Sequence, residues 1–240
     1  MKKRVLSIIA MLAMTASMAA CGSSGEPAPT PEDGEGGDTN VSSEAGDLIT
    51  VGYAQVGAES DWRTANTESF KSTFTEENGY KLIFDDAQQK QENQIKAIRS
   101  FIQQDVDYIV VAPVVETGWE TVLEEAKEAG IPVILSDRMM QVSDDELYVA
   151  WVGGNFVKEG ETCGEWLAKY LEEKGRGDEE INIVTIQGTI GASAQVGRTE
   201  GFNNILTQHD NWKMLDMQSG EFTQAKGQEV MESFLKSDDD

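Results

Sequence analysis

Residues 107–138 read DYIVVAPVVETGWETVLEEAKEAGIPVILSDR and predict a strand, a helix and a second strand in succession. The apolar runs Ile109-Val110-Val111 and Val133-Ile134-Leu135 are typical of parallel strands that helices cover on both faces. The apolar residues between the two runs recur at helical spacing: Trp119, Val122, Leu123 and Ala126. Gly130 stands where this helix should end. The stretch therefore predicts a βαβ unit of a parallel sheet.

The same alternation continues on both sides of this unit. We expect strands at residues 48–54, 80–84, 108–112, 132–135, 147–152, 181–186 and 213–217. Two further apolar stripes predict helices: Ile95, Ile98, Phe101 and Ile102 form one, and Cys163, Trp166, Leu167, Tyr170 and Leu171 form the other. Because Cys163 falls on the second stripe, we expect it to be a buried core thiol rather than a reactive one.

This order of elements predicts an α/β protein with two doubly wound parallel-sheet domains joined by a hinge. The first domain is expected at residues 48–152 and the second at residues 153–240. The second domain is expected to be incomplete, because only two strands precede its final helix.

The first 47 residues lack the strand and helix patterns of the rest of the chain and instead have the features of an exported protein. Residues 1–20 have a basic start, a short apolar stretch and small residues at the end, which is the layout of a secretory signal peptide. The run Ser17-Met18-Ala19-Ala20-Cys21 resembles a bacterial lipobox, so Cys21 is expected to carry the lipid anchor. The alternative is a secreted protein cut at an Ala-x-Ala-like site. After Cys21, the rest of residues 21–47 is polar and acidic, and we expect a disordered linker.

The composition is strongly acidic, with 43 Asp and Glu against 19 Lys and Arg and a formal net charge of -24. This charge excludes nucleic acid as a partner and argues against adsorption to anionic lipid except through the anchor. With one His and two Cys in the chain, a Cys and His metal site is poorly supported.

The loops that follow the strands are where doubly wound folds bind ligands. The loop after the first strand contains Gln55, Glu59, Trp62 and Arg63. A Trp and an Arg at a helix start can be a core residue beside a surface cation. In a cleft, the indole offers an apolar platform for the C–H face of a sugar, and the guanidinium donates hydrogen bonds to hydroxyls. We favour the binding role.

The loop after residues 132–135 contains Asp137 and Arg138. They can form a surface ion pair of little energetic consequence. Alternatively, the carboxylate of Asp137 can accept hydrogen bonds and the guanidinium of Arg138 can donate them, and together they suit a ligand with many hydroxyls.

Two other loops carry weaker signals. Residues 187–193 contain two glycines before the helix that carries Arg198, and such a loop can cradle an anion, although it matches no phosphate-binding motif. Residues 85–91 begin with Asp85 and Asp86, a pair that could hydrolyse glycosides or simply start a charged helix.

Five segments in these loops and helices resemble the ribose-type periplasmic binding proteins of ABC sugar importers, in particular the galactofuranose-binding branch. They are VGYAQVGAESDWR (51–63), DAQQKQENQIKAIRSFIQQDVDYIVVAPVVETGW (86–119), AGIPVILSDR (129–138), IVTIQGTIGASAQVGRTEGF (183–202) and QSGEFTQAKGQEVMESFLK (218–236). The resemblance implies a type I periplasmic binding protein fold that closes on a monosaccharide. It also implies a monomer without a cofactor that delivers its sugar to a membrane permease.

Carried over by motif, the resemblance places Trp62, Arg63, Asp137 and Arg138 against the sugar from the first domain and Arg198 from the second. Gln55 and Glu59 are further candidates. The family performs no catalysis on its ligand. This sequence differs in having Gly197 where the family carries an Asp before the Arg, and family members continue past residue 240.

The sequence also bears on three other classes of function. A sugar-sensing receptor would use the same cleft with a different partner. An extracellular glycosidase is disfavoured by the single His and the absence of a nucleophile motif. A transcriptional regulator is excluded by the export signal and the acidic charge.

Overall fold

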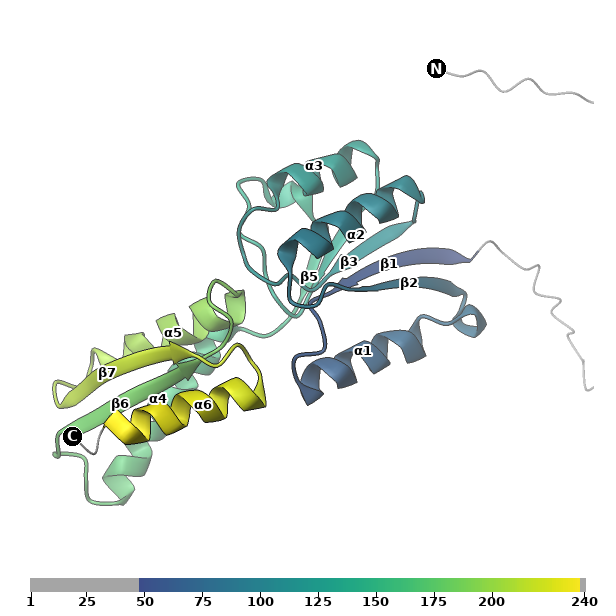
Figure 1. Cartoon of the computed structure of the whole chain (residues 1–240). Coiled ribbons are helices and arrows are strands. Elements are labelled where there is room, and N and C mark those ends of the chain that lie inside the picture. The colour runs from purple at the N-terminus through teal and green to yellow at the C-terminus, as the bar shows by residue number, and fades with distance from the viewer. Residues whose placement is uncertain (1–47, 238–240) are drawn as a thin grey trace, which may run out of the picture. The chain divides into compact units, whose positions relative to one another are not determined.

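The computed structural model describes residues 48–237 (Figure 1). The predicted signal peptide, Cys21 and the predicted linker lie outside these residues. Within residues 48–237, no helix is both long enough and apolar enough to cross a membrane.

A five-stranded, all-parallel sheet is formed by residues 49–152, which we call the five-stranded part. Its strand order is β2-β1-β3-β4-β5. The strands are β1 (Ile49–Gln55), β2 (Tyr80–Asp86), β3 (Tyr108–Val111), β4 (Val133–Ser136) and β5 (Ala150–Val152). The helices are α1 (Asp61–Thr73), α2 (Gln91–Gln103) and α3 (Glu120–Glu128), with 3-10 turns η1 (Glu76–Asn78) and η2 (Asp145–Leu147). Figure 1 shows α2 and α3 on one face of the sheet and α1 on the other.

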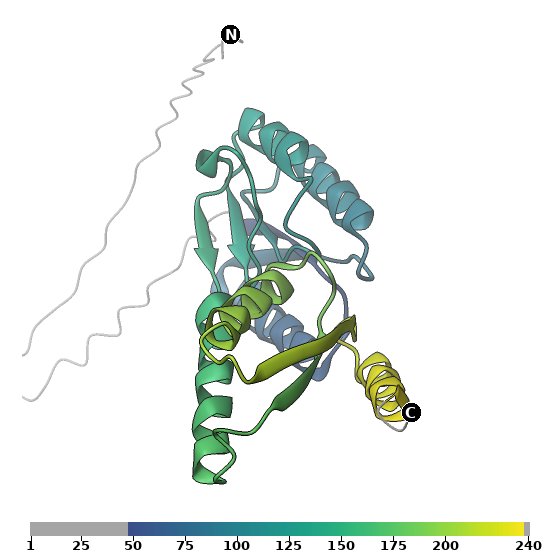
Figure 2. The ribbon, with the colours of Figure 1, turned by 90° about the vertical axis from the view of Figure 1, so that its left-hand side faces the viewer.

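A second sheet lies in residues 156–237, which we call the two-stranded part. It pairs β6 (Ile181–Gln187) with β7 (Trp212–Ser219) in parallel. Its helices are α4 (Phe156–Glu173), α5 (Ser193–Leu206) and α6 (Gln224–Ser237). Figure 2 shows the two strands between α4 and α5 on one side and α6 on the other. The α/β fold with parallel strands is therefore confirmed.

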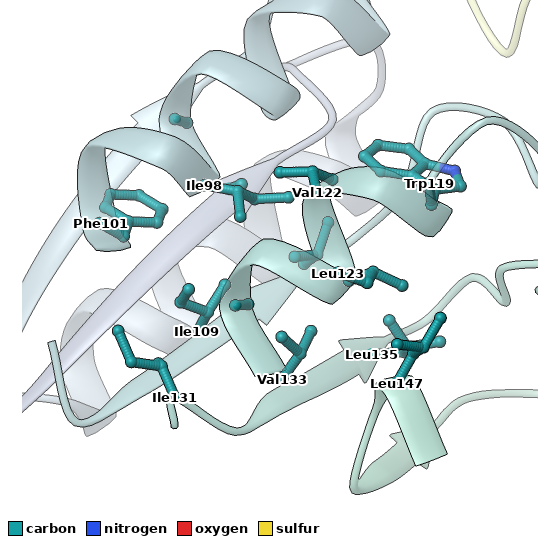
Figure 3. Packing of buried hydrophobic residues seen from close by; sticks show 14 of the residues in the cluster. Ile98, Phe101, Ile109, Trp119, Val122, Leu123, Ile131, Val133, Leu135 and Leu147 are labelled. Carbon is teal, nitrogen blue, oxygen red and sulfur yellow. The ribbon is translucent and has the colours of Figure 1, made fainter. Parts of the chain in front are cut away.

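Both faces of the five-stranded sheet are packed, as the apolar runs predicted. Ile109 and Val111 pack with Trp119 and Leu123 on the face covered by α2 and α3 (Figure 3). Val110, which lies between them in β3, points to the opposite face and packs in a second cluster near α1. Successive residues of one strand therefore fill two cores, which explains why the run has no polar alternation.

One predicted strand is shorter than expected. Residues 147–152 were predicted as strand, but Leu147 closes η2 and only Ala150–Val152 pair with β4. The Asp144 carboxylate accepts a hydrogen bond from the Glu146 N–H at 2.9 Å and stabilises the 3-10 turn. Leu147 is still buried, and it packs into the core from this turn.

The prediction that Cys163 is a buried core thiol is wrong, because Cys163 is exposed. Trp166 and Tyr170 on the same stripe are also exposed, at 61% and 41%. The buried face of α4 instead runs through Gly160 and Gly164. Leu171 of the predicted stripe is buried and Leu167 packs against the same core cluster, so the stripe is correct along that edge. Hydrophobic periodicity cannot detect a face made of glycines, which is why the stripe extends too far around the helix to Cys163, Trp166 and Tyr170.

Glycines on both helices allow α4 and α5 to pack closely. A Cβ at Gly164 would lie 2.7 Å from the Ile205 Cβ, and one at Gly201 would collide with the Val157 carbonyl oxygen. The two backbones are therefore nearly in contact, and an added Cβ at Gly160 would collide with the Arg198 carbonyl oxygen, so the packing places Arg198 beside the first turns of α4.

Gly201→Ala is expected to lower the free energy of unfolding by about 1–3 kcal/mol, because the added methyl group has no space between the helices. Gly227→Ala is the matched control. It lies inside α6 with nothing within 4 Å of an added Cβ, so it should stabilise the protein by about 0.5–1 kcal/mol. Urea unfolding measures both changes, and equal effects would contradict the packing described here.

Candidate functional site

A cleft of about 400 Å³ draws its walls from both parts of the described chain. It is lined by Glu59, Ser60, Trp62, Arg63, Asp137, Arg138, Gly154, Phe156, Glu159, Ala194, Arg198 and Phe222. Six of the seven residues predicted to bind the ligand are therefore found around one cleft, and the exception is Gln55.

The start of α1 positions the first group of cleft residues. The Ser60 hydroxyl accepts a hydrogen bond from the Arg63 N–H at 3.2 Å and caps the helix, so Trp62 and Arg63 lie in its first turn. Trp62 is 58% exposed, whereas Arg63 is buried, with its guanidinium 4.8 Å from the Trp62 ring centroid. The cation thus lies against the indole, which remains free to contact a ligand.

A strained turn after β4 positions Asp137 and Arg138. Asp137 has a φ of 63°, and the Arg138 N–H donates to the Ser136 carbonyl at 2.7 Å, closing a three-residue turn. The Asp137 N–H donates to the Val152 carbonyl at 2.7 Å, which ties the turn to β5. A non-glycine residue in this conformation is costly, and such strain concentrates at functional sites.

Four charged side chains of these two loops form a buried network. Arg63 donates from Nε to Glu59 Oε1 at 3.0 Å and from Nη2 to Asp137 Oδ2 at 2.7 Å. The Arg138 Nη2 lies 3.4 Å from Glu59 Oε1. Both arginine side chains and Glu59 are at most 4% exposed, and Asp137 is 17% exposed. Two cations and two anions therefore balance inside the five-stranded part.

Burial and neighbouring charges shift the pKa values of the two arginines in opposite directions. Burial lowers the pKa of Arg63, but Asp137 and Glu59 together more than offset this, so the pKa is raised. Burial lowers the pKa of Arg138 to about 10, and the nearby charge of Arg63 adds to this effect. Arg138 still carries its positive charge at neutral pH, so it can donate charge-assisted hydrogen bonds.

The two-stranded part contributes an ion pair and two phenyl rings. The Arg198 Nε donates to Glu159 Oε2 at 2.8 Å, and both side chains are about half exposed. The Arg198 guanidinium lies 5.1 Å from the Phe156 ring centroid, and that of Arg138 lies 4.9 Å from the Phe222 ring centroid. Phe222 thus brings the loop after β7 against a residue that follows β4.

Hydrogen bonds also connect the two parts beside the cleft. The Met139 N–H donates to the Ser193 hydroxyl at 2.9 Å, and the Glu116 N–H donates to the Gly191 carbonyl at 2.8 Å. Within the same loop, the Gly191 N–H donates to the Gln195 side chain at 3.0 Å. The glycine-containing loop, residues 187–193, therefore joins the two parts through these hydrogen bonds. None of its residues is among those lining the cleft.

Gln55 lies behind the cleft. Its side chain is fully buried, and its amide donates to Asn66 Oδ1 at 2.9 Å and to Thr67 Oγ1 at 3.0 Å. The same Asn66 oxygen lies 3.5 Å from the Arg63 Nη1. Gln55 therefore supports the helix that carries Arg63, and its predicted contact with a ligand stays a prediction.

Sequence reasoning did not single out Phe156, Glu159 and Phe222. Phe222 follows β7 and obeys the same strand-end rule that identified the other loops, so it could have been found. Phe156 and Glu159 start α4, immediately after the chain leaves β5. The pair Asp85 and Asp86 does not line the cleft. In residues 48–237, no three His, Cys, Asp or Glu residues gather closely enough to hold a metal ion.

A larger groove of about 700 Å³ adjoins the cleft along β6, and it is lined mainly by apolar side chains from α4, α5 and both strands. Glu159, Arg198 and Phe222 border both spaces. Hydrogen-bonding groups that converge on a small volume are typical of sites for polar ligands. The smaller cleft has them in the buried network, so it is the candidate site for a polar ligand.

Several known proteins are similar in sequence to most of the described chain. Galactofuranose-binding protein YtfQ of Escherichia coli is 50% identical over 190 residues, covering 79% of this chain and 58% of that protein. A Mycobacterium smegmatis structure in complex with β-D-fucofuranose has 49% identity and a TM-score of 0.75, covering 79% of this chain and 61% of that one.

An arabinose transporter's binding protein from Shewanella, bound to α- and β-L-arabinofuranose, also has 49% identity, with a TM-score of 0.73 and coverage of 79% and 61%. The chain thus spans less than two thirds of the length of each of these relatives. Residues 51–240 match the model of the periplasmic binding protein domain. The chain therefore belongs to the periplasmic binding protein family, with its type I α/β fold.

Proposed function

We propose that this chain captures a monosaccharide in its furanose form, as the extracytoplasmic solute-binding component of an ABC importer. The observation that carries this proposal is the cleft in which the exposed Trp62 indole lies beside buried guanidinium and carboxylate groups from the loops that follow β1 and β4. Three relatives that are 49–50% identical carry galactofuranose, β-D-fucofuranose or L-arabinofuranose in their names or titles, and all three sugars have five-membered rings.

Each part of the cleft suits one feature of a sugar. Trp62 offers a flat apolar surface for the C–H groups of the ring. Arg138 and Asp137 offer donors and an acceptor for adjacent hydroxyls, and Arg198 offers a further donor from the two-stranded part. A sugar held by both parts would stabilise the arrangement in which they face each other, about a hinge at residues 153–155.

Titration calorimetry of the chain without residues 1–21 tests the proposal. Galactofuranose and L-arabinofuranose are expected to bind, whereas methyl galactopyranoside, whose ring cannot open, is not. No heat and no change in tryptophan emission with any of these sugars would refute the proposed function. Preference for the locked pyranoside would refute the assignment of ring form.

We also propose that residues 1–20 direct export and that Cys21 is lipidated, so that residues 21–47 tether the folded part to the outer face of the cytoplasmic membrane. The signal-peptide layout of residues 1–20 and the lipobox-like run that ends at Cys21 support this proposal. The acidic linker and the acidic charge of the chain both disfavour direct adsorption to anionic lipid, so attachment would depend on the lipid at Cys21. A membrane permease would then receive the sugar.

Cys21→Ser is expected to abolish labelling of the protein by radioactive palmitate in growing cells and to move it from the membrane fraction to the medium or periplasm. Cys163→Ser is the matched control, because this exposed thiol lies far along the sequence from the lipobox. Equal labelling of the wild type and Cys21→Ser would contradict the anchor.

A further inference from the structure

Gln94 is completely buried in the first turn of α2 and does not line the cleft. Its side-chain nitrogen donates to the Ala54 carbonyl at 3.1 Å and to the Ala112 carbonyl at 2.6 Å. Its side-chain oxygen accepts a hydrogen bond from the Val114 N–H at 2.9 Å. Both amide hydrogens and the oxygen are therefore used, and they connect the end of β1 to the residues that follow β3.

The segment after β3 needs such a side chain. β3 ends at Val111, and Pro113 has no N–H with which to continue the ladder of hydrogen bonds. Ala112 and Val114 are nevertheless buried, and a buried backbone group without a partner is unfavourable. A side-chain amide is uncharged and can donate twice and accept at the same time, so Gln94 serves the carbonyl of one residue and the N–H of the other.

The same segment is the backbone anchor of Arg138. The Arg138 Nη1 donates to the Val114 carbonyl at 3.2 Å and lies 3.5 Å from the Pro113 carbonyl oxygen. Val114 is thus held through its N–H by Gln94 and in turn holds the guanidinium through its carbonyl. The placement of the guanidinium therefore depends on a segment that Gln94 fixes.

We infer that Gln94 is a positioning residue for sugar binding: its amide fixes Pro113 and Val114, and their carbonyls hold the Arg138 guanidinium in the orientation that a sugar hydroxyl needs. The inference rests on the proposed function. It goes further by naming a buried residue outside the cleft that controls the affinity without touching the ligand.

Directional contacts explain why this anchor matters more than the charge beside it. Glu59 lies 3.4 Å from the Arg138 Nη2, and the attraction between two charges acts over many orientations. The hydrogen bond to the Val114 carbonyl is directional, so it sets where the remaining N–H groups of the guanidinium point. A long side chain that is already ordered loses less conformational entropy when the ligand binds.

Gln94→Met tests the inference, because methionine has a similar length and cannot replace the three hydrogen bonds. Galactofuranose is expected to bind about 10-fold more weakly by titration calorimetry, which corresponds to one well-placed hydrogen bond from Arg138. In the Arg138→Ala protein, the same substitution should cause no further loss, because the group that Gln94 positions is already gone. Equal losses in the two backgrounds would overturn the inference.

Gln94→Glu gives a test that can be reversed by pH. Burial among carbonyl oxygens raises the pKa of the introduced carboxyl group above its ordinary value. At pH 5 the neutral acid keeps one donor and one acceptor, so its affinity relative to the wild type at the same pH should be close to 1. At pH 9 the ionised group has no donor and repels the two carbonyl oxygens, and binding should be about 10-fold weaker than that of the wild type. A ratio that does not change with pH would overturn the inference.

Ile98→Ala is the matched control, because Ile98 lies one turn further along α2, is completely buried and packs only into the apolar core. It should lower the melting temperature by about 5–15 °C and leave the affinity of the folded protein unchanged. If Ile98→Ala weakens binding as much as Gln94→Met, the effect is general destabilisation and the inference fails. If Gln94→Met does not fold, the pH dependence of Gln94→Glu decides. Failure of the wild type to bind galactofuranose would instead overturn the proposed function.

Discussion

Arg63→Ala is expected to lower the free energy of unfolding by about 3–5 kcal/mol, because it removes one cation from a buried network and leaves two carboxylates short of a partner. Arg63 is 2% exposed and donates to Glu59 at 3.0 Å and to Asp137 at 2.7 Å. Its loss also frees Asn66, which lies between it and Gln55. Urea unfolding at pH 7 measures the change.

Arg99→Ala is the control for this prediction. Arg99 makes two hydrogen bonds of 2.7 Å to Glu125, which is better local geometry than most of the buried network has. Both side chains are nevertheless exposed to solvent, at 48% and 37%, so water replaces the lost interaction and little change is expected. Similar losses of stability in the two variants would show that burial does not determine the strength of these ion pairs.

Arg138→Ala is expected to weaken sugar binding by at least about a hundredfold, because truncating a buried, hydrogen-bonded cation at a binding site is unfavourable by several kcal/mol. The guanidinium donates to the Val114 carbonyl at 3.2 Å and to Glu59 at 3.4 Å, which holds it in place before any ligand arrives. Its Nε lies 3.9 Å from Asp137 Oδ2, beyond hydrogen-bond distance, and so remains available to a hydroxyl. Titration calorimetry with galactofuranose gives the affinity.

Two further variants separate charge from geometry at this position. Arg138→Lys keeps the positive charge but cannot bridge Val114 and Glu59 as a planar fork, so it should recover only part of the affinity. Arg176→Ala removes an arginine that pairs with Glu179 away from the cleft, and its affinity should match the wild type. An Arg138→Ala protein that melts like the wild type and binds with unchanged affinity would remove Arg138 from the site.

The fold of residues 48–237 follows largely from hydrophobic periodicity. The runs around Val110 and Ile134 predict buried parallel strands, and the helix between them ends at Glu128, two residues before Gly130, which has a φ of 74°. Periodicity failed where burial does not depend on apolar side chains. The side of α4 that carries Gly160 and Gly164 is buried because glycines let α5 approach, and this left Cys163 in solvent.

The strand-end rule located most of the cleft, because parallel strands bring their carboxyl ends to one edge. It could not rank the side chains within a loop. Gln55 and Glu59 follow the same strand, yet Gln55 turns toward α1 and Glu59 lines the cleft. Gln55 is the last residue of β1, and its side chain bonds to α1, whereas Glu59 lies in the loop beyond the strand, next to the Ser60 cap of α1. The spacing of residues in the sequence does not show where the strand ends and the loop begins.

The central claim is that the cleft between the strand ends holds the sugar, and a crystal structure of the protein with galactofuranose tests it most directly. We expect the ring against the Trp62 indole, with its hydroxyls within hydrogen-bond distance of Arg138, Asp137 and Glu59. A sugar bound elsewhere, such as in the apolar groove along β6, with the buried network unchanged and Trp62 still free, would contradict the claim.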